Sequence, residues 1–369
     1  MSEGIAHACS TRGAPTLSMH PMTGLRTRVA VCVPVRDERD GLPALLDAFA
    51  RQSAARDCFV VCLLFDGCDD GGDAYVQARQ SQLDYSLTSA RIPRQPEARA
   101  GRARRAAMDM GARLLARVRR PGDIELLLTT DADSIPAPDW IETSIRALEQ
   151  ADVVAGYIER PDAAPAELHR RVERYWERLR SLQRTVDPLL HDPAPSHHSQ
   201  GGASLGFRAD VYTALGGFAD VASHEDVGLV TAARQAGYRV RHDRNVRVAT
   251  SSRMRGRATN GLADTLRARQ TSRAMPAVED PDRALARYRL SALARQAFDA
   301  LDDEAIVHAL AERAGRDTDE LRAIAAQCAS AEGFVMRIAP EPANAQDLAL
   351  DLAEQRLALL ETAHQCPHA

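Results

Sequence analysis

The chain has 369 residues, of which 45% are hydrophobic, and its formal net charge is −4. This length allows one large α/β domain with an appendage, or two domains, and the charge gives no electrostatic reason to expect a nucleic-acid partner. All 47 basic residues are arginine, so a Schiff-base lysine and a P-loop lysine are both excluded.

The first half of the chain is expected to alternate between strands and helices. Residues 1–27 are rich in Ser, Thr, Gly and Pro and are expected to form a disordered tail. Apolar, β-branched runs then predict strands over 28–35, 58–65, 124–129 and 152–156. Helical spacing between them predicts helices over 42–54, 100–118 and 141–148. This alternation predicts an α/β fold with a doubly wound, mostly parallel sheet and helices on both faces.

The second half of the chain is expected to be richer in helices. The segment 164–185 reads as one long amphipathic helix whose Tyr175 and Trp176 belong to a core. A polar segment over 187–200, a short strand and helix over 201–217, an acidic turn and helix over 221–237, and a strand over 240–250 follow. Beyond about residue 260 the composition is rich in Ala, Arg, Glu and Leu. Residues 261–369 are therefore expected to form a helical C-terminal extension that packs on the preceding domain or on a partner.

The seven cysteines bear on the cellular compartment. Their number is odd, and they are scattered without a paired Cys-x-x-Cys spacing. A reduced, cytoplasmic protein is therefore favoured over a disulfide scaffold or a zinc site. No apolar run approaches the ~18 residues of a membrane span and no signal-peptide pattern opens the sequence, so no transmembrane segment is expected.

Acidic residues follow three of the predicted strands. Glu38 follows the first strand, Asp66 ends the second, and Asp131 and Asp133 come directly after the third. The carboxyl ends of parallel strands meet at one edge of a sheet, where ligands collect. A divalent cation with a bound diphosphate would neutralise such a cluster, and oxygen ligands suit Mg²⁺ or Mn²⁺.

Five motifs together resemble those of glycosyltransferase family 2, in the family's order, between about residues 28 and 260. They are Val33-Pro-Val-Arg-Asp-Glu38, Phe65-Asp-Gly-Cys-Asp-Asp70, Thr130-Asp-Ala-Asp133, the segment from Gly202 to Arg208 with Gly216-Gly-Phe218, and His224-Glu-Asp226. The resemblance implies a GT-A nucleotide-sugar fold over 28–260. It also implies transfer of a sugar from a nucleoside-diphosphate sugar to an acceptor hydroxyl, where the acceptor is a small molecule, a glycan or a lipid-linked molecule.

The resemblance further implies roles for individual residues. The nucleotide would be bound by Pro34, Arg36, Glu38, Asp66 and Asp131. Asp133, together with Asp131, would hold the Mg²⁺ or Mn²⁺ that bridges the diphosphate. Asp66 and Glu38 have a simpler alternative role as caps of the helices that follow them.

The same resemblance implies an acceptor side. Asp226 would be the general base of an inverting transfer, and Glu225 would orient the acceptor or support the loop. The acceptor would be bound at Gly202, Ala203 and Ser204. Glu225 and Asp226 would also be favoured as first-turn acids by the helix dipole alone.

Several basic residues depart from the family pattern or allow two interpretations. The family often places a histidine after the last strand, whereas this chain has Arg253, Arg255 and Arg257 there, which would meet the diphosphate directly. The cluster of Arg99, Arg102, Arg104 and Arg105 would contact phosphates or, more commonly, form a solvated helix face. His197 and His198 are expected to serve loop packing or acceptor contact rather than metal binding.

Two other functions compete with sugar transfer. A nucleotidyltransferase shares this type of sheet and uses Asp-bound Mg²⁺, but it normally has a Gly-rich loop after the first strand, where this chain has Val-Arg-Asp-Glu. A catalytically inactive nucleotide-sugar-binding partner protein would not need Asp131, Asp133 and Asp226. A dinucleotide oxidoreductase is disfavoured because no Gly-x-Gly-x-x-Gly follows the first strand.

Overall fold

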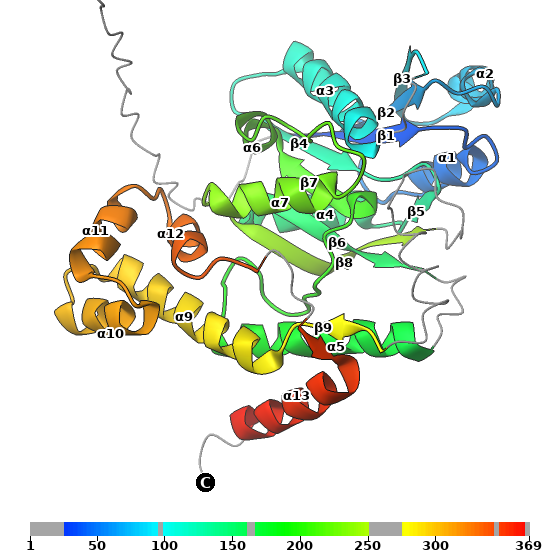
Figure 1. The fold of residues 1–369 in the computed structure, drawn as a ribbon. Coiled ribbons are helices and arrows are strands. Elements are labelled where there is room, and N and C mark those ends of the chain that lie inside the picture. Colours follow the sequence, from blue (N-terminus) through cyan, green and yellow to red (C-terminus); the bar gives the residue numbers. More distant parts are fainter. Residues whose placement is uncertain (1–25, 95–98, 161–166, 251–274, 343–346, 366–369) are drawn as a thin grey trace, which may run out of the picture.

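The computed structural model describes residues 26–94, 99–160, 167–250, 275–342 and 347–365 (Figure 1). One eight-stranded sheet lies between helices, and a group of C-terminal helices lies beside it. The strands are β1 (Thr27–Val35), β2 (Phe59–Asp66), β3 (Ser86–Ile92), β4 (Ile124–Thr129), β5 (Ser134–Pro136), β6 (Val153–Glu159), β7 (Leu205–Arg208) and β8 (Val240–Thr250). Their order across the sheet is β3-β2-β1-β4-β7-β6-β8-β5.

The sheet is mostly parallel, as the sequence predicts. β1 pairs in parallel with β2 and β4, β2 with β3, and β6 with β8. Only β7 and β5 run antiparallel to their neighbours. β5 and β7 are the shortest strands of the sheet, and β3 is mostly exposed or half-buried. β3 and β5 were not expected from the sequence.

Helices cover both faces of the sheet, which confirms the doubly wound α/β fold. The helices around it are α1 (Leu42–Ala50), α2 (Gly72–Arg79), α3 (Ala100–Val118), α4 (Trp140–Gln150), α6 (Ala209–Ala214) and α7 (Glu225–Gln235). Alternate residues of β1 enter two different cores. Val31 and Val33 pack in the cluster that contains α1 and α4, whereas Ala30 and Cys32 pack in the cluster that contains α3, α6 and α7.

The long helix α5 (Glu167–Val186) does not pack its apolar stripe on the sheet. Its buried residues Tyr175 and Leu179 share a core with Leu285 and Tyr288 from the C-terminal helices. Tyr175 is fully buried, as expected, and Trp176 is partly buried. The C-terminal helices therefore cover a surface that the preceding 250 residues leave apolar.

The C-terminal extension is helical, as predicted. It consists of β9 (Ala277–Val278), α9 (Pro281–Asp299), α10 (Glu304–Ala314), α11 (Thr318–Ala326), α12 (Ala331–Ile338), β10 (Leu348–Ala349) and α13 (Leu350–Gln365). Four of the helices begin after a residue whose side chain accepts a backbone N–H of the first turn, and these residues are Asp280, Asp303, Asp317 and Ser330. The expected boundary near residue 260 and the tail before residue 26 lie outside the described residues.

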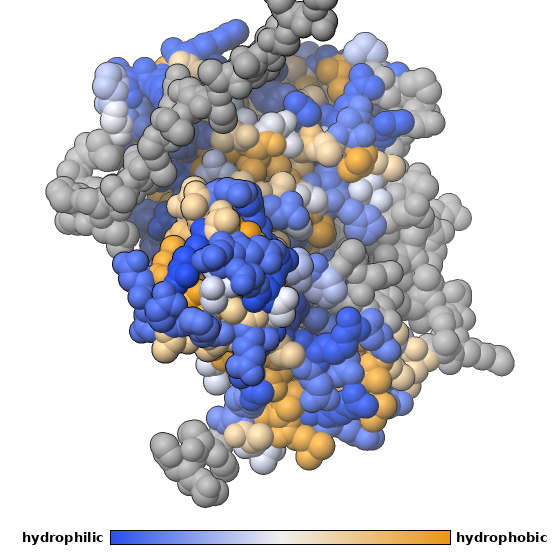
Figure 2. Space-filling model, turned by 60° about the vertical axis from the view of Figure 1, so that its left-hand side comes forward, coloured by the Kyte–Doolittle hydropathy of each residue, from blue (hydrophilic) through white to orange (hydrophobic). Residues whose placement is uncertain are grey.

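The surface is largely polar. On the face shown in Figure 2, hydrophobic residues are visible at the lower end, at the level at which α13 lies in Figure 1, and also between polar residues in the upper half. Leu352 and Leu359 of α13 are 42% and 73% exposed. Among the described helices, none is both long and apolar enough to cross a membrane.

Candidate active site

The carboxyl ends of β2, β1 and β4 lie side by side at one edge of the sheet. The three strands are adjacent and parallel, in the register Val35 with Phe65 and Cys32 with Thr129. Asp66 at the end of β2 and the loops that carry Arg36 and Asp131 therefore lie at the same edge of the sheet. This is the gathering that the sequence predicts from the acidic strand ends.

Asp66 is a buried carboxylate at this edge, with 4% of its surface exposed. Its Oδ2 accepts a hydrogen bond of 3.0 Å from Arg36 Nη1. Its Oδ1 is buried and has no hydrogen-bond partner within the described part of the chain. An unsatisfied buried acceptor costs about 1–3 kcal/mol, so this oxygen is suited to an N–H donor from a ligand. Asp66 does not cap α2, because that helix begins after Gly71.

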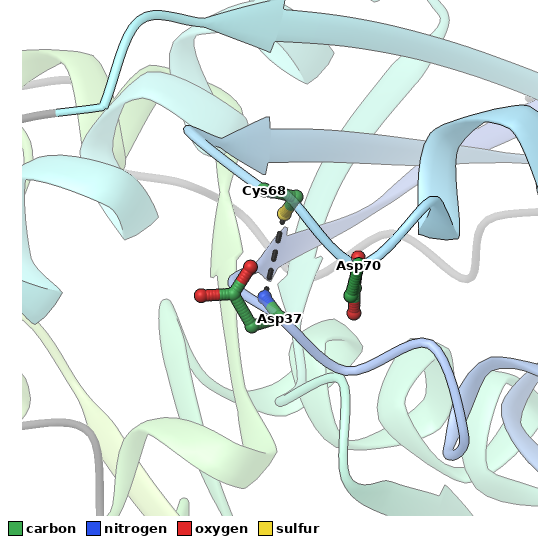
Figure 3. A group of neighbouring side chains, drawn as sticks. All are labelled: Asp37, Cys68 and Asp70. Atoms are coloured by element: carbon green, nitrogen blue, oxygen red, sulfur yellow. Dashed lines mark hydrogen bonds between the residues drawn. The ribbon is translucent and has the colours of Figure 1, made fainter.

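The loops after β1 and β2 are fastened together by Asp37, Cys68 and Asp70 (Figure 3). The Cys68 thiol accepts a hydrogen bond from Asp37 N at 3.4 Å and donates to Val35 O at 3.2 Å. Burial raises the pKa of this thiol, whereas a metal ligand would have to be a thiolate. The ligand atoms of the three residues lie within 4.8 Å of one another. The three residues nevertheless connect the two loops and do not suit a hard cation, which prefers oxygen ligands.

Arg104 of α3 joins the donor side of the site to its acceptor side. Its Nη2 donates to Asp131 Oδ1 at 2.9 Å, its Nε donates to Glu225 Oε1 at 3.2 Å, and its Nη1 donates to Gly202 O at 2.9 Å. Burial alone would lower the pKa of Arg104, but the carboxylates of Asp131 and Glu225 outweigh it and raise the pKa. One buried guanidinium thus connects three of the motifs that the sequence analysis singled out.

The position of Arg104 corrects one interpretation of the sequence. Arg99, Arg102 and Arg105 are exposed, but Arg104 is only 5% exposed and is not part of a solvated helix face. Helical spacing carries the signal that identifies it, because Arg104 is in phase with the buried Met108 of α3. An arginine in phase with the apolar stripe of a helix must be paired, since an unpaired buried charge is strongly destabilising.

Asp226 lies in the first turn of α7, next to this arginine. Its Oδ2 accepts a hydrogen bond of 2.7 Å from Gly202 N, and its Oδ1 accepts one of 2.8 Å from Val227 N. His224, directly before the helix, has a left-handed backbone with φ of 61°. Asp226 is half-buried, whereas Glu225 is buried against Arg104. The two carboxylates therefore have different environments, which fits a reactive role for Asp226 and a supporting one for Glu225.

The segment Gly202–Ser204, expected to bind the acceptor, is entirely buried. Ser204 Oγ accepts a hydrogen bond of 3.0 Å from Trp140 Nε1. Both polar backbone groups of Gly202 are used by Arg104 and Asp226. These contacts give the segment a positioning role, and direct contact with an acceptor stays a prediction.

The remaining predicted residues lie near the same edge. Pro34, Glu38 and Asp133 are partly exposed, and α1 begins after Gly41, so Glu38 is not its N-cap. An added Cβ at Gly41 would lie 3.2 Å from Ala132 O, which brings the loop after β1 against the Asp131–Asp133 turn. Arg253, Arg255 and Arg257 lie outside the described residues, so their expected diphosphate contact stays a prediction.

His197 and His198 both make packing contacts, one of the two roles expected for them, and contact with an acceptor stays a prediction. The Nε2 of His197 lies 3.1 Å from Ala155 O, and its Nδ1 accepts a hydrogen bond of 3.1 Å from Ser199 N. Burial lowers the pKa of His197 to about 3. The His198 ring is stacked on Trp176 with 6.2 Å between ring centroids.

Comparison with known proteins identifies the family. Residues 30–209 match the family model described as Glycosyl transferase family 2. Residues 30–209 thus form a glycosyltransferase family 2 domain. This match confirms the resemblance for the motifs up to Arg208, and it favours sugar transfer over nucleotidyl transfer. The motifs Gly216-Gly-Phe218 and His224-Glu-Asp226 lie beyond the matched residues.

Solved structures of glycosyltransferases are similar to this chain at low sequence identity. The mannosyltransferase PcManGT from Pyrobaculum calidifontis in complex with GDP-Man and Mn²⁺ has 18% identity and a TM-score of 0.48, over 94% of this chain and 77% of that one. TarS from S. aureus in complex with UDP-GlcNAc has 13% identity and a TM-score of 0.44, over 83% of this chain and 88% of that one. No curated protein matches the chain. These likenesses are too distant to identify a donor or an acceptor.

Proposed function

We propose that this glycosyltransferase moves a sugar from a nucleoside-diphosphate sugar to an acceptor hydroxyl by a single, inverting displacement. The observation that carries the proposal is the contact of Arg104 with both Asp131 and Glu225. It brings the strand-end carboxylates, which suit a nucleotide diphosphate, within reach of the acidic turn that begins α7.

The donor would lie across the edge formed by β2, β1 and β4. Asp66 Oδ1 would accept an N–H of the base, since this buried oxygen has no other hydrogen-bond partner in the described structure. Pro34, Arg36 and Glu38 would line the nucleotide pocket, and Asp131 would contact the ribose side.

Asp131 and Asp133 offer the carboxylate chemistry that Mg²⁺ or Mn²⁺ prefers. A bound ion there would stabilise the charge that develops on the leaving diphosphate. Arg104 holds Asp131 by its Oδ1, and this fixes the direction of that carboxylate. The donor set therefore fits a divalent cation.

Asp226 would take the proton from the acceptor hydroxyl. The acceptor oxygen then forms a bond to the anomeric carbon while the bond from that carbon to the diphosphate oxygen breaks, and the nucleoside diphosphate leaves with the electron pair. A carboxylate has about four lone-pair positions, and only two on Asp226 are used by backbone N–H groups. The two N–H groups orient the base without blocking it.

The direct test is a thermal-shift panel of nucleoside diphosphates with and without Mn²⁺, because a specific ligand stabilises by mass action. We expect one nucleoside diphosphate to raise the melting temperature, and Mn²⁺ to increase the shift. Asp133→Ala should remove the Mn²⁺-dependent part. Asp84→Ala serves as a matched control, since Asp84 is exposed and precedes β3 at the opposite edge of the sheet. A panel without any nucleotide-dependent shift would refute the proposal, and an unchanged Mn²⁺ effect in Asp133→Ala would refute the metal site.

A further inference from the structure

A second cleft lies where the C-terminal helices pack against the catalytic sheet. Its volume is about 260 Å³. Side chains from α5, α7, α9 and the segment before Gly202 line it, including Trp176, Arg180, Gln200, Arg234, Tyr288 and Glu341. Asp66, Asp131 and Asp133 are not among the described residues that line this cleft. The cleft is therefore separate from the proposed donor site.

The charged groups of this cleft already neutralise one another. Arg234 Nη1 donates to Glu341, Arg287 Nη2 donates to both carboxylate oxygens of Glu279 at 2.7 and 3.0 Å, and Arg180 Nη2 donates to Asp192 just behind the wall. An anionic ligand would have to compete with these carboxylates. The lining therefore favours a neutral, polar ligand.

Two buried polar atoms of the cleft lining lack a hydrogen-bond partner in the described structure. His198 Nε2 lies 3.4 Å from Glu173 Oε2, and the tautomer that carries its proton on Nε2 leaves Nδ1 as an acceptor. This Nδ1 and Gln200 Oε1 are both buried without a partner in the described structure. A ligand rich in hydroxyl groups would supply the missing donors, whereas a phosphate or carboxylate brings only acceptors.

Apolar side chains lie beside these polar groups. The Trp176 ring stacks on His198 at an interplanar angle of 26°, and Leu179 and Tyr288 continue the surface. A flat aromatic and aliphatic wall beside a few fixed polar groups matches a sugar ring, which has C–H faces and hydroxyl edges.

The cleft is also close to the proposed base. Gln200 precedes Gly202 by two residues, so their Cα atoms are at most about 8 Å apart. Gly202 N in turn donates to Asp226 Oδ2 at 2.7 Å. The Gln200 side of the cleft is thus joined to the carboxylate of Asp226 through a short, hydrogen-bonded segment.

We propose that this cleft binds a saccharide unit of the acceptor. The inference rests on the proposed function and names the chemical class of the acceptor, a neutral polyhydroxylated ring. The C-terminal extension then takes part in acceptor recognition through α9 and the Glu341 segment.

The test uses methyl α-D-glucopyranoside, methyl α-D-mannopyranoside and N-acetylglucosamine at millimolar concentrations, with inorganic phosphate as the ionic alternative. Trp176 reports binding by fluorescence, because the only other tryptophan, Trp140, is buried in the sheet core. We expect at least one saccharide, and not phosphate, to change the emission. Gln200→Leu should weaken binding by about tenfold, the effect of one buried hydrogen bond. Trp176→Leu should abolish saccharide binding when it is followed by saturation-transfer NMR.

Gln82→Leu is the matched control, since Gln82 is exposed at the end of the short 3₁₀ helix Gln80–Gln82, and it should bind saccharide like the parent protein. Nucleoside diphosphate binding is measured on every variant and shows that each is folded. If nucleotide binds but no saccharide does, if phosphate alone binds, or if Gln200→Leu binds saccharide normally, the acceptor inference is wrong and the proposed function stands. If no nucleotide binds either, both are overturned.

Discussion

Asp226 is the residue on which the proposed chemistry depends most directly. Asp226→Asn keeps the shape of the side chain and one acceptor oxygen, but it does not accept a proton. We expect turnover to fall by about 10²–10⁴-fold while the affinity for nucleoside diphosphate is retained, because a general base acts only in the transition state. The measurement is steady-state turnover with calorimetric binding of the nucleotide.

The stereochemistry of the product provides an independent check on Asp226. An inverting displacement gives a product whose anomeric configuration is opposite to that of the donor, which NMR of the product resolves. Retained configuration, or near-normal turnover in Asp226→Asn, would remove Asp226 from the role of base.

His197 makes the stability of the protein depend on pH. Burial lowers its pKa to about 3 from an ordinary value of 6.5. Above about pH 6.5 the ring is neutral in both states, whereas between about 6.5 and 3 only the unfolded chain binds the proton, so stability falls as the pH falls. His197→Gln keeps a donor toward Ala155 O and an acceptor for Ser199 N.

We therefore expect denaturant unfolding of His197→Gln to show a weaker pH dependence than the parent protein between pH 6 and pH 4. The difference in slope should be about 1.4 kcal/mol per pH unit, the value for one proton. Equal slopes would mean that the ring of His197 already titrates in the folded protein.

At the scale of elements, the approach of α3 to the sheet places Arg104. Gly111 permits this approach, because a Cβ there would lie 2.4 Å from Cys32 Sγ and 3.0 Å from Ala30 Cβ on β1. Alanine is normally better than glycine inside a helix by about 1 kcal/mol. Gly111→Ala should nevertheless destabilise the protein by about 1–3 kcal/mol, because the core would be overpacked.

Gly228 of α7 is the matched control, since a Cβ there meets nothing within 4 Å. Gly228→Ala is expected to leave stability unchanged or to raise it slightly. Chemical denaturation of the two variants measures the contrast. A stabilised Gly111→Ala would show that α3 can move away from β1 without loss.

The sequence predicts those elements whose burial is periodic or continuous. β4, β8 and α3 have the predicted bounds, because apolar residues are continuous in β4, alternate at Val246 and Val248 in β8, and recur at helical spacing in α3. β5 and β7 have three and four residues, and nothing in so short a run specifies an antiparallel direction. β3 is mostly exposed at the sheet edge, so it lacks an apolar signature.

The candidate site was predictable to a similar extent. Short motifs single out Asp66 and Asp131 at the ends of predicted strands and Asp226 in a predicted acidic turn, and the structure places Asp131 and Asp226 near Arg104, whereas their roles stay predictions. The role of Arg104 depends on tertiary contacts with Asp131 and Glu225, which are 27 and 121 residues away in the chain. Contacts over such separations are not encoded in a local pattern, although the helical phase of Arg104 indicates that it is buried.

At the scale of the whole molecule, α5 and the C-terminal helices form one structural unit. Leu285 of α9 is 5% exposed in the core that it shares with α5. Leu285→Ala should cost about 2–5 kcal/mol, as for other buried leucines. Hydrogen exchange should accelerate in the amides of α5, and those of β1 and β4 should keep their protection.

Leu359→Ala is the control for this prediction, because Leu359 of α13 is 73% exposed. It should change stability by less than about 0.5 kcal/mol. If the amides of α5 kept their protection in Leu285→Ala, the C-terminal extension would be a separate unit with a boundary near residue 260.

The ion pairs between α5 and α13 all use arginine in the described structure. Arg171 contacts Asp351 and Glu354, and Arg178 contacts Glu361. A guanidinium remains charged up to about pH 12, so these ion pairs between α5 and α13 persist in alkaline solution, in which ion pairs of lysine would be lost. The same composition leaves no side-chain primary amine in the 369 residues. This protein therefore has no side-chain target for lysine acetylation, for ubiquitin attachment to lysine or for amine-reactive cross-linkers. Cross-linking of α5 to α13 requires carboxyl-directed or arginine-directed reagents.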